Sequence, residues 1–235
     1  MDVTAAILAG GLGTRLRPVV GDRPKVLAPV AGRPCLTYLL DQLAGAGVRK
    51  VVLLTGHGAG QVRAALGERY EGMRLVYSAE PAPLGTGGAP RLALAHLTAP
   101  MVLLLNGDSY CDVDLAAFRR SHRAGTSVVL TRVADASRFG RVRLGADDRV
   151  VGFEEKGAAR GRAWVNAGVY LIDRALIEEV PPARPVSLEH DLLPGWVAGR
   201  RVRGYRCSGR FLDIGTPPSY AEAADFFPKV GMTAP

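Results

Sequence analysis

The chain has 235 residues, a length that fits one sizeable domain with its own hydrophobic core. Hydrophobic residues make up 48% and charged residues 22%, as in ordinary globular proteins, and no apolar run approaches the ~20 residues needed to span a bilayer. The net charge of +8 comes mainly from scattered arginines without interleaved aromatic residues, so it favours a site for small polyanions over a nucleic-acid surface.

Three cysteines, Cys35, Cys111 and Cys207, lie far apart in the sequence and lack Cys-x-x-Cys spacing. This pattern argues against a disulfide framework and against a zinc site. The first residues, Met-Asp, lack the basic region of a signal peptide. We therefore expect a reduced, cytoplasmic protein that does not bind a membrane.

Short apolar runs alternate with helical patterns in the N-terminal half, which predicts βα units and a mostly parallel sheet. Strands are expected at Val3–Leu8, Val51–Leu54, Arg74–Tyr77, Met101–Leu105 and Thr126–Val133. Helices are expected from Pro34 to Leu43, at Gly60–Leu66, from the Glu80–Gly88 loop to Leu97, and at Leu115–Ala124.

The pattern changes after residue 133, where strands follow one another with little helix between them. Strands are expected at Val142–Leu144, Arg149–Phe153, Trp164–Leu171, Val202–Cys207 and Phe211–Ile214, and helices at Ala175–Val180, Leu188–Val197 and Pro217–Phe227. The prediction is an α/β fold, doubly wound and Rossmann-like, with a mixed, mostly parallel sheet. The additional C-terminal strands form a lid or a second binding floor.

The glycine-rich loop after the first strand is typical of a phosphate site. Gly10, Gly11 and Gly13 allow backbone N–H groups to approach anionic oxygens, and Arg15 and Lys25 add fixed positive charge. The loop has no Gly-Lys pair, which excludes a P-loop, and a leucine replaces the third glycine of the dinucleotide fingerprint. The chain is therefore expected to handle a nucleotide or a phosphorylated metabolite.

Several carboxylates stand where a metal ligand is expected. Asp108 follows a central apolar strand, where it can hold Mg²⁺ or cap the next helix, and the central position of the strand favours the metal. Asp112 and Asp114 form an Asp-x-Asp pair, but Asp114 directly precedes a predicted helix and is expected to be its N-cap. Asp213 ends another strand and is either a second metal ligand or a turn residue.

Two further segments carry polar groups at strand ends. The rigid Glu80–Gly88 loop suits a flat base, and Glu80 can accept two hydrogen bonds from guanine; alternatively it is an ordinary loop with a solvated glutamate. Glu155 and Lys156 end a strand-like run, where a lysine beside a carboxylate can bind a phosphate and a sugar hydroxyl. The alternative for this pair is an exposed charged turn.

Six segments, in this order and over nearly the whole chain, resemble the sugar-1-phosphate nucleotidylyltransferases. They are the glycine loop with Thr-Arg-Leu-Arg and Pro-Lys, then Pro-Leu-Gly-Thr-Gly-Gly, Asn-Gly-Asp, Glu-Glu-Lys, Asn-Ala-Gly-Val-Tyr and Leu-Asp-Ile-Gly-Thr-Pro. The chain is most similar to the D-glycero-D-manno-heptose 1-phosphate guanylyltransferases. This similarity rests on the Leu-Asn-Gly-Asp and Ser-Leu-Glu stretches and on the absence of a C-terminal β-helix. Mannose-1-phosphate guanylyltransferases and N-acetylmuramate-1-phosphate uridylyltransferases are close neighbours.

The resemblance implies one domain over 1–235, with a nucleotide-binding half (1–133) and a sugar-phosphate-binding half (134–227). It implies Mg²⁺-dependent joining of an NTP, with GTP favoured, to a sugar 1-phosphate, and it is compatible with a homodimer. The implied catalytic residues are Arg15, Lys25 and Asp108; nucleotide contacts are Leu8, Gly10, Gly11, Gly13, Thr14, Glu80, Gly85 and Thr86; sugar-phosphate contacts are Asn106, Gly140, Glu155, Lys156 and Asn166; and metal ligands are Asp108 and Asp213.

Three positions depart from the family pattern. Val26 stands where proline usually follows the lysine, Gly157 stands where proline is common, and Phe211 replaces a frequent tryptophan. None of these changes removes a charge that the chemistry needs, but the last two bear on sugar selectivity. Two weaker alternatives stay open: a glycosyltransferase that uses the Asp-x-Asp pair, and a nucleotide-binding regulatory subunit.

Overall fold

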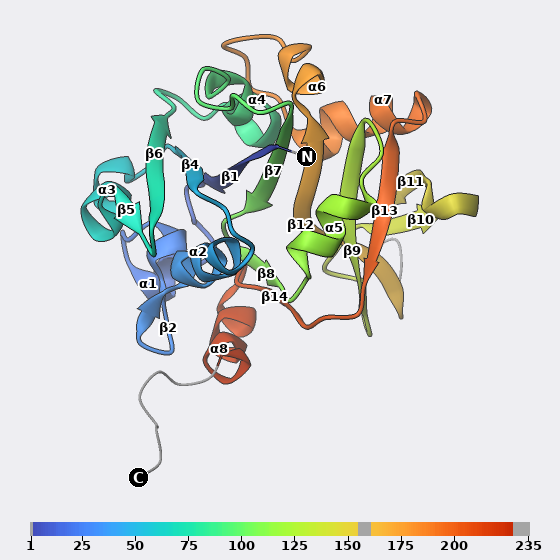
Figure 1. The fold of residues 1–235 in the computed structure, drawn as a ribbon. Coiled ribbons are helices and arrows are strands. Elements are labelled where there is room, and N and C mark those ends of the chain that lie inside the picture. Colours follow the sequence, from blue (N-terminus) through green and yellow to red (C-terminus); the bar gives the residue numbers. More distant parts are fainter. Residues whose placement is uncertain (1, 155–160, 228–235) are drawn as a thin grey trace.

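The computed structural model describes residues 2–154 and 161–227, and a ten-stranded sheet runs through them (Figure 1). Its strands are β1 (Val3–Ala9), β4 (Lys50–Thr55), β5 (Arg69–Tyr70), β6 (Met73–Ala79), β7 (Met101–Asn106), β9 (Thr126–Val133), β10 (Arg141–Leu144), β11 (Val150–Glu154), β12 (Ala163–Asp173) and β13 (Val202–Cys207). Two small sheets pair β2 (Pro29–Val30) with β3 (Arg33–Pro34), and β8 (Ser109–Cys111) with β14 (Phe211–Asp213).

The helices are α1 (Arg17–Val20), α2 (Cys35–Gly45), α3 (Ala59–Leu66), α4 (Gly85–Leu92), α5 (Leu115–Ser121), α6 (Arg174–Glu178), α7 (Leu193–Ala198) and α8 (Pro217–Phe226). Single 3-10 turns occur at η1 (Lys25–Leu27) and η2 (Ala146–Asp148), and a π-helical turn, η3 (Leu188–Leu192), leads directly into α7. None of the described helices is long and apolar enough to cross a membrane.

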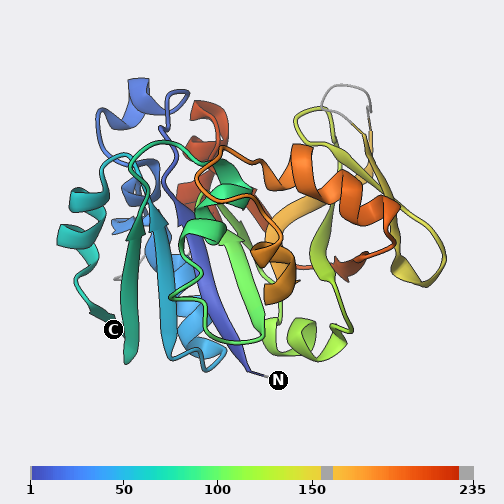
Figure 2. The same cartoon turned by 90° about the horizontal axis from the view of Figure 1, so that it is seen from above.

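Parallel strands form the centre of the sheet. The order is β11-β10-β12-β7-β1-β4-β6-β5, with β9 paired to β12 and β13 paired to β9. Neighbours within β6-β4-β1-β7 are parallel, whereas β12 lies antiparallel to β7, β9 and β10. Figure 2 shows β4 and β6 at one end of the molecule and the β10–β11 hairpin at the other. The expected α/β fold with a central, mostly parallel sheet is confirmed.

Helices cover both faces of this sheet because its strands are apolar on both sides. Ile7, Leu53 and Leu103 face the buried side chains of α2, α3 and α5, whereas Ala6 and Leu104 face those of α4, α6 and α7. Figure 1 shows α4, α6 and α7 along one side of the sheet and α2 and α5 along the other. This three-layer arrangement leaves the carboxyl ends of β1, β6 and β7 open for a site.

Local details differ from the sequence prediction at several ends. The helix expected to reach Leu97 ends at Leu92, because His96 and Leu97 donate to carbonyls three residues back and form tight turns instead. The single helix expected over residues 188–197 is a π-helical turn followed by α7. Asp114 caps α5 as predicted, since its Oδ1 accepts the Ala117 N–H at 2.8 Å.

Candidate active site

A cavity of about 260 Å³ lies at the carboxyl ends of the parallel strands, where open α/β sheets bind ligands. Its lining includes Leu8, Gly10, Gly11, Lys25, Glu80, Gly85, Thr86, Asn106 and Asp108. These residues come from the ends of β1, β6 and β7, from η1 and from the first turn of α4. Segments far apart in the sequence therefore supply one wall each of the same cavity.

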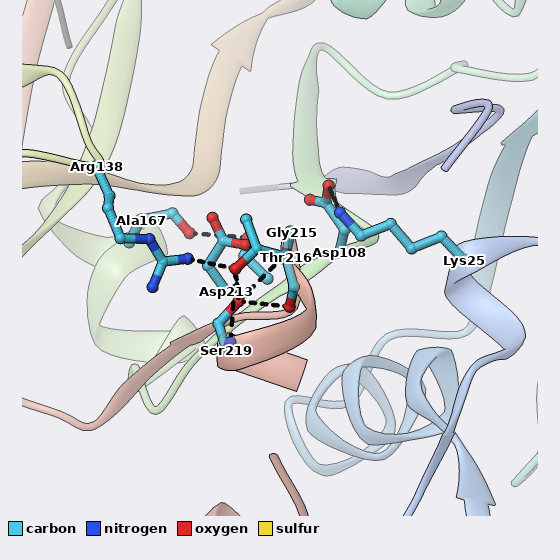
Figure 3. A network of polar contacts seen from close by, with 9 residues as sticks. Lys25, Asp108, Arg138, Ala167, Asp213, Gly215, Thr216 and Ser219 are labelled. Carbon is cyan, nitrogen blue, oxygen red and sulfur yellow. Dashed lines mark hydrogen bonds and ion pairs between the residues drawn. The ribbon is translucent and has the colours of Figure 1, made fainter. Parts of the chain in front are cut away.

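An ion pair crosses this cavity. Lys25 Nζ lies 2.8 Å from Asp108 Oδ2, and the Lys25 side chain is only 11% exposed whereas that of Asp108 is 44% exposed. Figure 3 shows the extended lysine reaching Asp108 from the side opposite Asp213 and Thr216. A nearly buried ammonium group beside a partly exposed carboxylate can exchange its partner for a phosphate oxygen that enters the cavity.

Gly107 fixes the position of Asp108. The Gly107 N–H donates to the Leu8 carbonyl oxygen at 3.0 Å, so the chain after β7 lies directly against the end of β1. A Cβ atom at residue 107 would stand 2.4 Å from that oxygen, closer than any carbon can approach without a backbone shift. Glycine at this position thus allows the carboxylate to follow the central strand so closely.

Glu80 occupies the floor between the ends of β1 and β4. Its Oε2 accepts the Leu84 N–H at 3.0 Å, and a Cβ atom on Gly10 or Gly56 would lie 2.8 or 2.7 Å from its Oε1. Burial raises the pKa of Glu80 above its usual value, while the Leu84 hydrogen bond lowers it to a smaller extent. The carboxylate is therefore held in a fixed place at the base of the first cavity.

A second cavity of about 470 Å³ adjoins the first. Gly85, Thr86, Asn106 and Asp108 line both cavities. The second cavity also includes Gly140, Asn166 and Asp213, three residues that the sequence analysis assigned to the sugar phosphate or the metal, and the aromatic side chains of Phe139, Phe153 and Phe211. Two ligands bound in these cavities would meet beside Asp108.

A buried hydrogen-bond chain supports the border between the cavities. Asn166 Nδ2 donates to the Tyr170 hydroxyl at 2.6 Å, and that hydroxyl donates to Glu189 Oε1 at 3.1 Å. Thr86 donates to Glu189 Oε2 at 2.6 Å and accepts the Leu188 N–H at 2.8 Å. Burial and the negative charge of Glu189 raise the pKa of Tyr170 far above its usual value, so the hydroxyl stays a donor.

Sequence reasoning did not assign Tyr170 or Glu189 to the site, although both lie in motifs that it quoted. Glu189 belongs to the Ser-Leu-Glu stretch, and Tyr170 ends the Asn-Ala-Gly-Val-Tyr segment that begins at Asn166. β12 has an irregularity between these residues, with Gly168 at a φ of 74°, and Asn166 and Tyr170 pair with Leu130 and Val128 of β9. The hydrogen bond from Asn166 to the Tyr170 hydroxyl, rather than a regular strand period, links Tyr170 to the site.

The pairing of β8 with β14 brings Asp213 to Asp108. Asp213 lies opposite Ser109 in this small sheet, and the Ile214 N–H donates to the Asp108 carbonyl oxygen at 3.0 Å. The Asp213 carboxylate accepts the Gly215 N–H, and the Arg138 guanidinium donates to Thr216 nearby (Figure 3). Both carboxylates line the second cavity, and they supply the hard oxygen ligands that Mg²⁺ prefers.

Residues 2–154 and 161–227 contain no cluster of three or more His, Cys, Asp or Glu side chains that could hold a metal ion by themselves. A cation bound by Asp108 and Asp213 would take its remaining ligands from water or from substrate phosphates. This two-carboxylate arrangement fits Mg²⁺, which usually keeps several waters and binds through one or two carboxylates.

The other residues that the sequence analysis considered differ in how they are placed relative to the two cavities. Thr14 and Arg15 are exposed on the glycine loop and do not line the two described cavities. Gly13 packs against Lys25, because a Cβ atom added at residue 13 would lie 3.2 Å from the Lys25 Cβ. Glu155 and Lys156 lie outside the described residues, as does Gly157. Asp112 and Asp114 line neither cavity, which leaves the Asp-x-Asp pair without a place in this site.

The fold and the paired cavities define a class of phosphate-handling α/β transferases, and the chain belongs to the nucleotidyl transferase family, whose profile matches residues 4–230. The chain is 36% identical to the D-glycero-alpha-D-manno-heptose 1-phosphate guanylyltransferase of Aneurinibacillus thermoaerophilus, over 93% of this chain and 96% of that protein. It is also 36% identical to the mannose-1-phosphate guanylyltransferase of Mycobacterium tuberculosis, over 95% of this chain and 64% of that protein.

A solved structure has the same fold. HddC from Yersinia pseudotuberculosis, crystallised with GMP-PN, superposes with a TM-score of 0.84 at 31% identity, over 96% of this chain and 99% of that chain. The expected membership of the sugar-1-phosphate nucleotidylyltransferases is therefore confirmed. The chain spans 64% of the mycobacterial enzyme and 96% of each of two D-glycero-alpha-D-manno-heptose 1-phosphate guanylyltransferases.

Proposed function

We propose that this protein transfers the guanylyl group of GTP to D-glycero-D-manno-heptose 1-phosphate and releases pyrophosphate and the GDP-sugar. The observation that carries the proposal is the meeting of two cavities at Asp108, with the Lys25 ammonium 2.8 Å from its carboxylate. Two relatives named as heptose 1-phosphate guanylyltransferases, at 36% and 30% identity over more than 90% of this chain, support this choice of sugar. Mannose 1-phosphate is the second candidate, supported by the 36% identity to the mycobacterial enzyme.

The reaction needs no general base, because a sugar 1-phosphate is already ionised and nucleophilic at neutral pH. One of its phosphate oxygens attacks the α-phosphorus of GTP in line. A bond forms between these two atoms while the bond from the α-phosphorus to the bridging oxygen breaks, and pyrophosphate leaves with the electron pair. Such chemistry is mostly positioning and charge stabilisation.

Lys25 supplies positive charge at the place where the two anions meet. In the free protein its ammonium is paired with Asp108, and an entering phosphate oxygen replaces that partner. The glycines at the end of β1 offer backbone N–H groups to the triphosphate, and Arg15 adds its guanidinium from the exposed loop. These groups offset the repulsion between the two substrates.

Asp108 and Asp213 would hold Mg²⁺ at the border between the cavities. When bound, the ion neutralises charge on the phosphates, a Lewis-acid role that side chains alone fill only in part. Asp108 is 44% exposed toward the cavities, so its carboxylate is accessible to a cation once Lys25 has moved to a phosphate.

The first cavity holds guanine and its triphosphate in this proposal. Guanine presents two adjacent donors on its Watson–Crick edge, and the fixed Glu80 carboxylate at the base of this cavity can accept from them. The second cavity holds the sugar phosphate, with Asn166 and Gly140 in its lining. On this basis residues 1–133 form the nucleotide half, and residues 134–227 form most of the sugar-phosphate half.

The test is a pyrophosphate-release assay. GTP, ATP, UTP, CTP and dTTP are crossed against heptose, mannose, glucose and N-acetylmuramic acid 1-phosphates, with and without Mg²⁺, and Asp108→Asn serves as the inactive control. Mg²⁺-dependent release with GTP and heptose 1-phosphate, above every other pair, is the expected result. Release only with another pair would keep the reaction class and overturn the substrate, whereas no release from any pair would refute the proposed activity.

A further inference from the structure

Two cysteines that are far apart in the sequence touch in the fold. Cys111 ends β8 and Cys207 ends β13, and their sulfur atoms are 3.8 Å apart. Both side chains are buried, with 0% and 7% of the residue exposed, and both are free thiols. The third cysteine, Cys35, lies elsewhere, in the first turn of α2. Two reduced sulfur atoms at contact distance need only a small movement to form a disulfide on oxidation.

The surroundings make the two sulfurs chemically unequal. Cys207 Sγ accepts a hydrogen bond from the Cys111 thiol and another from the Gly209 N–H at 3.3 Å. These bonds stabilise a thiolate and lower the pKa of Cys207 to about 6, against the opposing effect of burial. The pKa of Cys111 is raised by the hydrogen bond that it donates to Cys207 and by burial. Although the Cys207 sulfur also lies 3.6 Å from the Asp112 carbonyl oxygen, the two hydrogen bonds that it accepts favour Cys207 over Cys111 as the attacking sulfur of the pair.

Cys207 lies beside an exposed turn, which the Asp112 N–H holds through a 2.9 Å hydrogen bond to the Arg210 carbonyl oxygen. It directly precedes the turn of residues 208–210 that joins β13 to β14, and Ser208 and Arg210 in that turn are exposed. Turns of this kind open locally at a much lower free energy than the sheet behind them. Both cysteines belong to the same core cluster, but Cys207 is 7% exposed and Cys111 is 0% exposed, so opening of the turn should uncover Cys207 first.

We propose that Cys111 and Cys207 form a redox-modification site, which a small disulfide of the glutathione class converts into an intramolecular disulfide. The Cys207 thiolate attacks one sulfur of the reagent, so that a mixed disulfide forms and one thiolate leaves. The Cys111 thiol then loses its proton and attacks Cys207 Sγ, which forms the protein disulfide and expels the second thiolate. The protein loses two electrons and two protons, and the reagent is reduced to two thiols.

The disulfide would act on the candidate active site through one small sheet. Cys111 pairs with Phe211 at one end of the β8–β14 sheet, and Ser109, next to Asp108, pairs with Asp213 at the other end. A disulfide needs a sulfur–sulfur distance of about 2.05 Å, so side-chain rotation and a shift of β8 or of the turn must close the 3.8 Å contact. Since misplacement by about 1 Å can cost a hundredfold in rate, we expect oxidation to lower kcat by at least about tenfold. This effect on turnover rests on the proposed function.

The site itself is tested without any activity measurement. Folded wild-type protein is incubated with oxidised glutathione, quenched with an alkylating agent and mapped by mass spectrometry without reduction. We expect the peptides that contain Cys111 and Cys207 to be linked, one of three thiols to remain free, and dithiothreitol to reverse the link. Cys35→Ser is the matched control and should form the same link, whereas Cys111→Ser should stop at a glutathione adduct on Cys207.

Three free thiols in the folded wild-type protein after this treatment, or a link that involves Cys35, would overturn the proposal. Turnover is then compared for reduced and oxidised wild-type protein, with Cys207→Ser as the variant that oxidation should leave unchanged. A linked protein with unchanged kcat would overturn the effect on the active site alone. A reduced protein without any nucleotidylyl transfer would instead refute the proposed function and leave the disulfide site standing.

Discussion

Lys25→Met separates the catalytic role of the Lys25–Asp108 ion pair from its contribution to stability. Methionine keeps an unbranched apolar stem but removes the ammonium group that lies 2.8 Å from Asp108 Oδ2. Because the Asp108 side chain is 44% exposed, water can solvate its carboxylate after the change. The free energy of unfolding should then fall by only about 1 kcal/mol. For a chain of 235 residues this loss lowers Tm by roughly 2–4 °C.

The expected effect on turnover is much larger. A unit charge about 3 Å from a phosphate oxygen interacts by roughly 5 kcal/mol at an effective dielectric constant of about 20. Part of this interaction already exists when the substrates are bound, so only the remainder affects kcat. The loss of one preorganised group typically lowers kcat by about 10²–10³, which equals about 2.7–4 kcal/mol, and we expect Lys25→Met to fall in this range.

Pyrophosphate release at saturating GTP and heptose 1-phosphate measures kcat, and thermal denaturation in the same buffer measures stability. Arg17→Met is a matched control, because Arg17 follows the same glycine loop and its ion pair with Asp22 is exposed. We expect the control to keep wild-type turnover. A Lys25→Met protein with near-wild-type kcat would refute the catalytic reasoning. A large loss of Tm with a proportionate loss of folded protein would show instead that the pair is structural.

Three more variants test separate parts of the site. Burial raises the pKa of Glu80, so its carboxylate becomes protonated at a higher pH than an ordinary glutamate does. GTP binding should weaken over the same pH range. Glu80→Gln should raise KM for GTP and remove this pH dependence in kinetics measured across the acidic range. Because burial penalises the charged form, wild-type stability should also decrease as pH rises from the ordinary to the raised pKa, and thermal melts of Glu80→Gln should lack that decrease. Asp213→Asn should increase the Mg²⁺ concentration needed for half-maximal turnover, and an unchanged Mg²⁺ titration would exclude Asp213 as a ligand. Tyr170→Phe removes a hydrogen bond to the Glu189 carboxylate and should raise KM for the sugar 1-phosphate about tenfold, with a smaller change in KM for GTP.

Local sequence patterns predicted most of the longer strands along the chain and the polar residues at their ends. Asp108 is the clearest case, because an unbroken apolar run identifies a buried strand and the first carboxylate after it must lie at the edge of the sheet. The same reasoning predicted Asp114 as a helix cap. In both cases the residues that form the pattern are within about four positions of each other, so local backbone geometry fixes their relative placement.

Long-range pairings could not be predicted in this way. Strands β8 and β14 have three residues each, too few for a period-two pattern, and roughly a hundred positions separate them along the chain. Their pairing aligns Asp213 with the residue next to Asp108. The contact between Cys111 and Cys207 depends on the same return of the chain, and the Thr86–Glu189 hydrogen bond joins residues that are 103 positions apart. No spacing rule connects such residues before the fold is known.

On the proposed function, the two cavities separate the chemistry from the choice of sugar. Asp108 follows the central strand β7, where the Gly107–Leu8 contact leaves little freedom for substitution, and its partner Lys25 reaches it from η1. Phe211, which replaces the tryptophan frequent in the family, lies instead on the wall of the second cavity and packs edge-on against Phe139 at a centroid distance of 5.6 Å. A change of this wall can alter the space for the sugar without moving the ion pair. The Phe211 departure should therefore affect KM for the sugar 1-phosphate and leave the Mg²⁺ and GTP requirements unchanged.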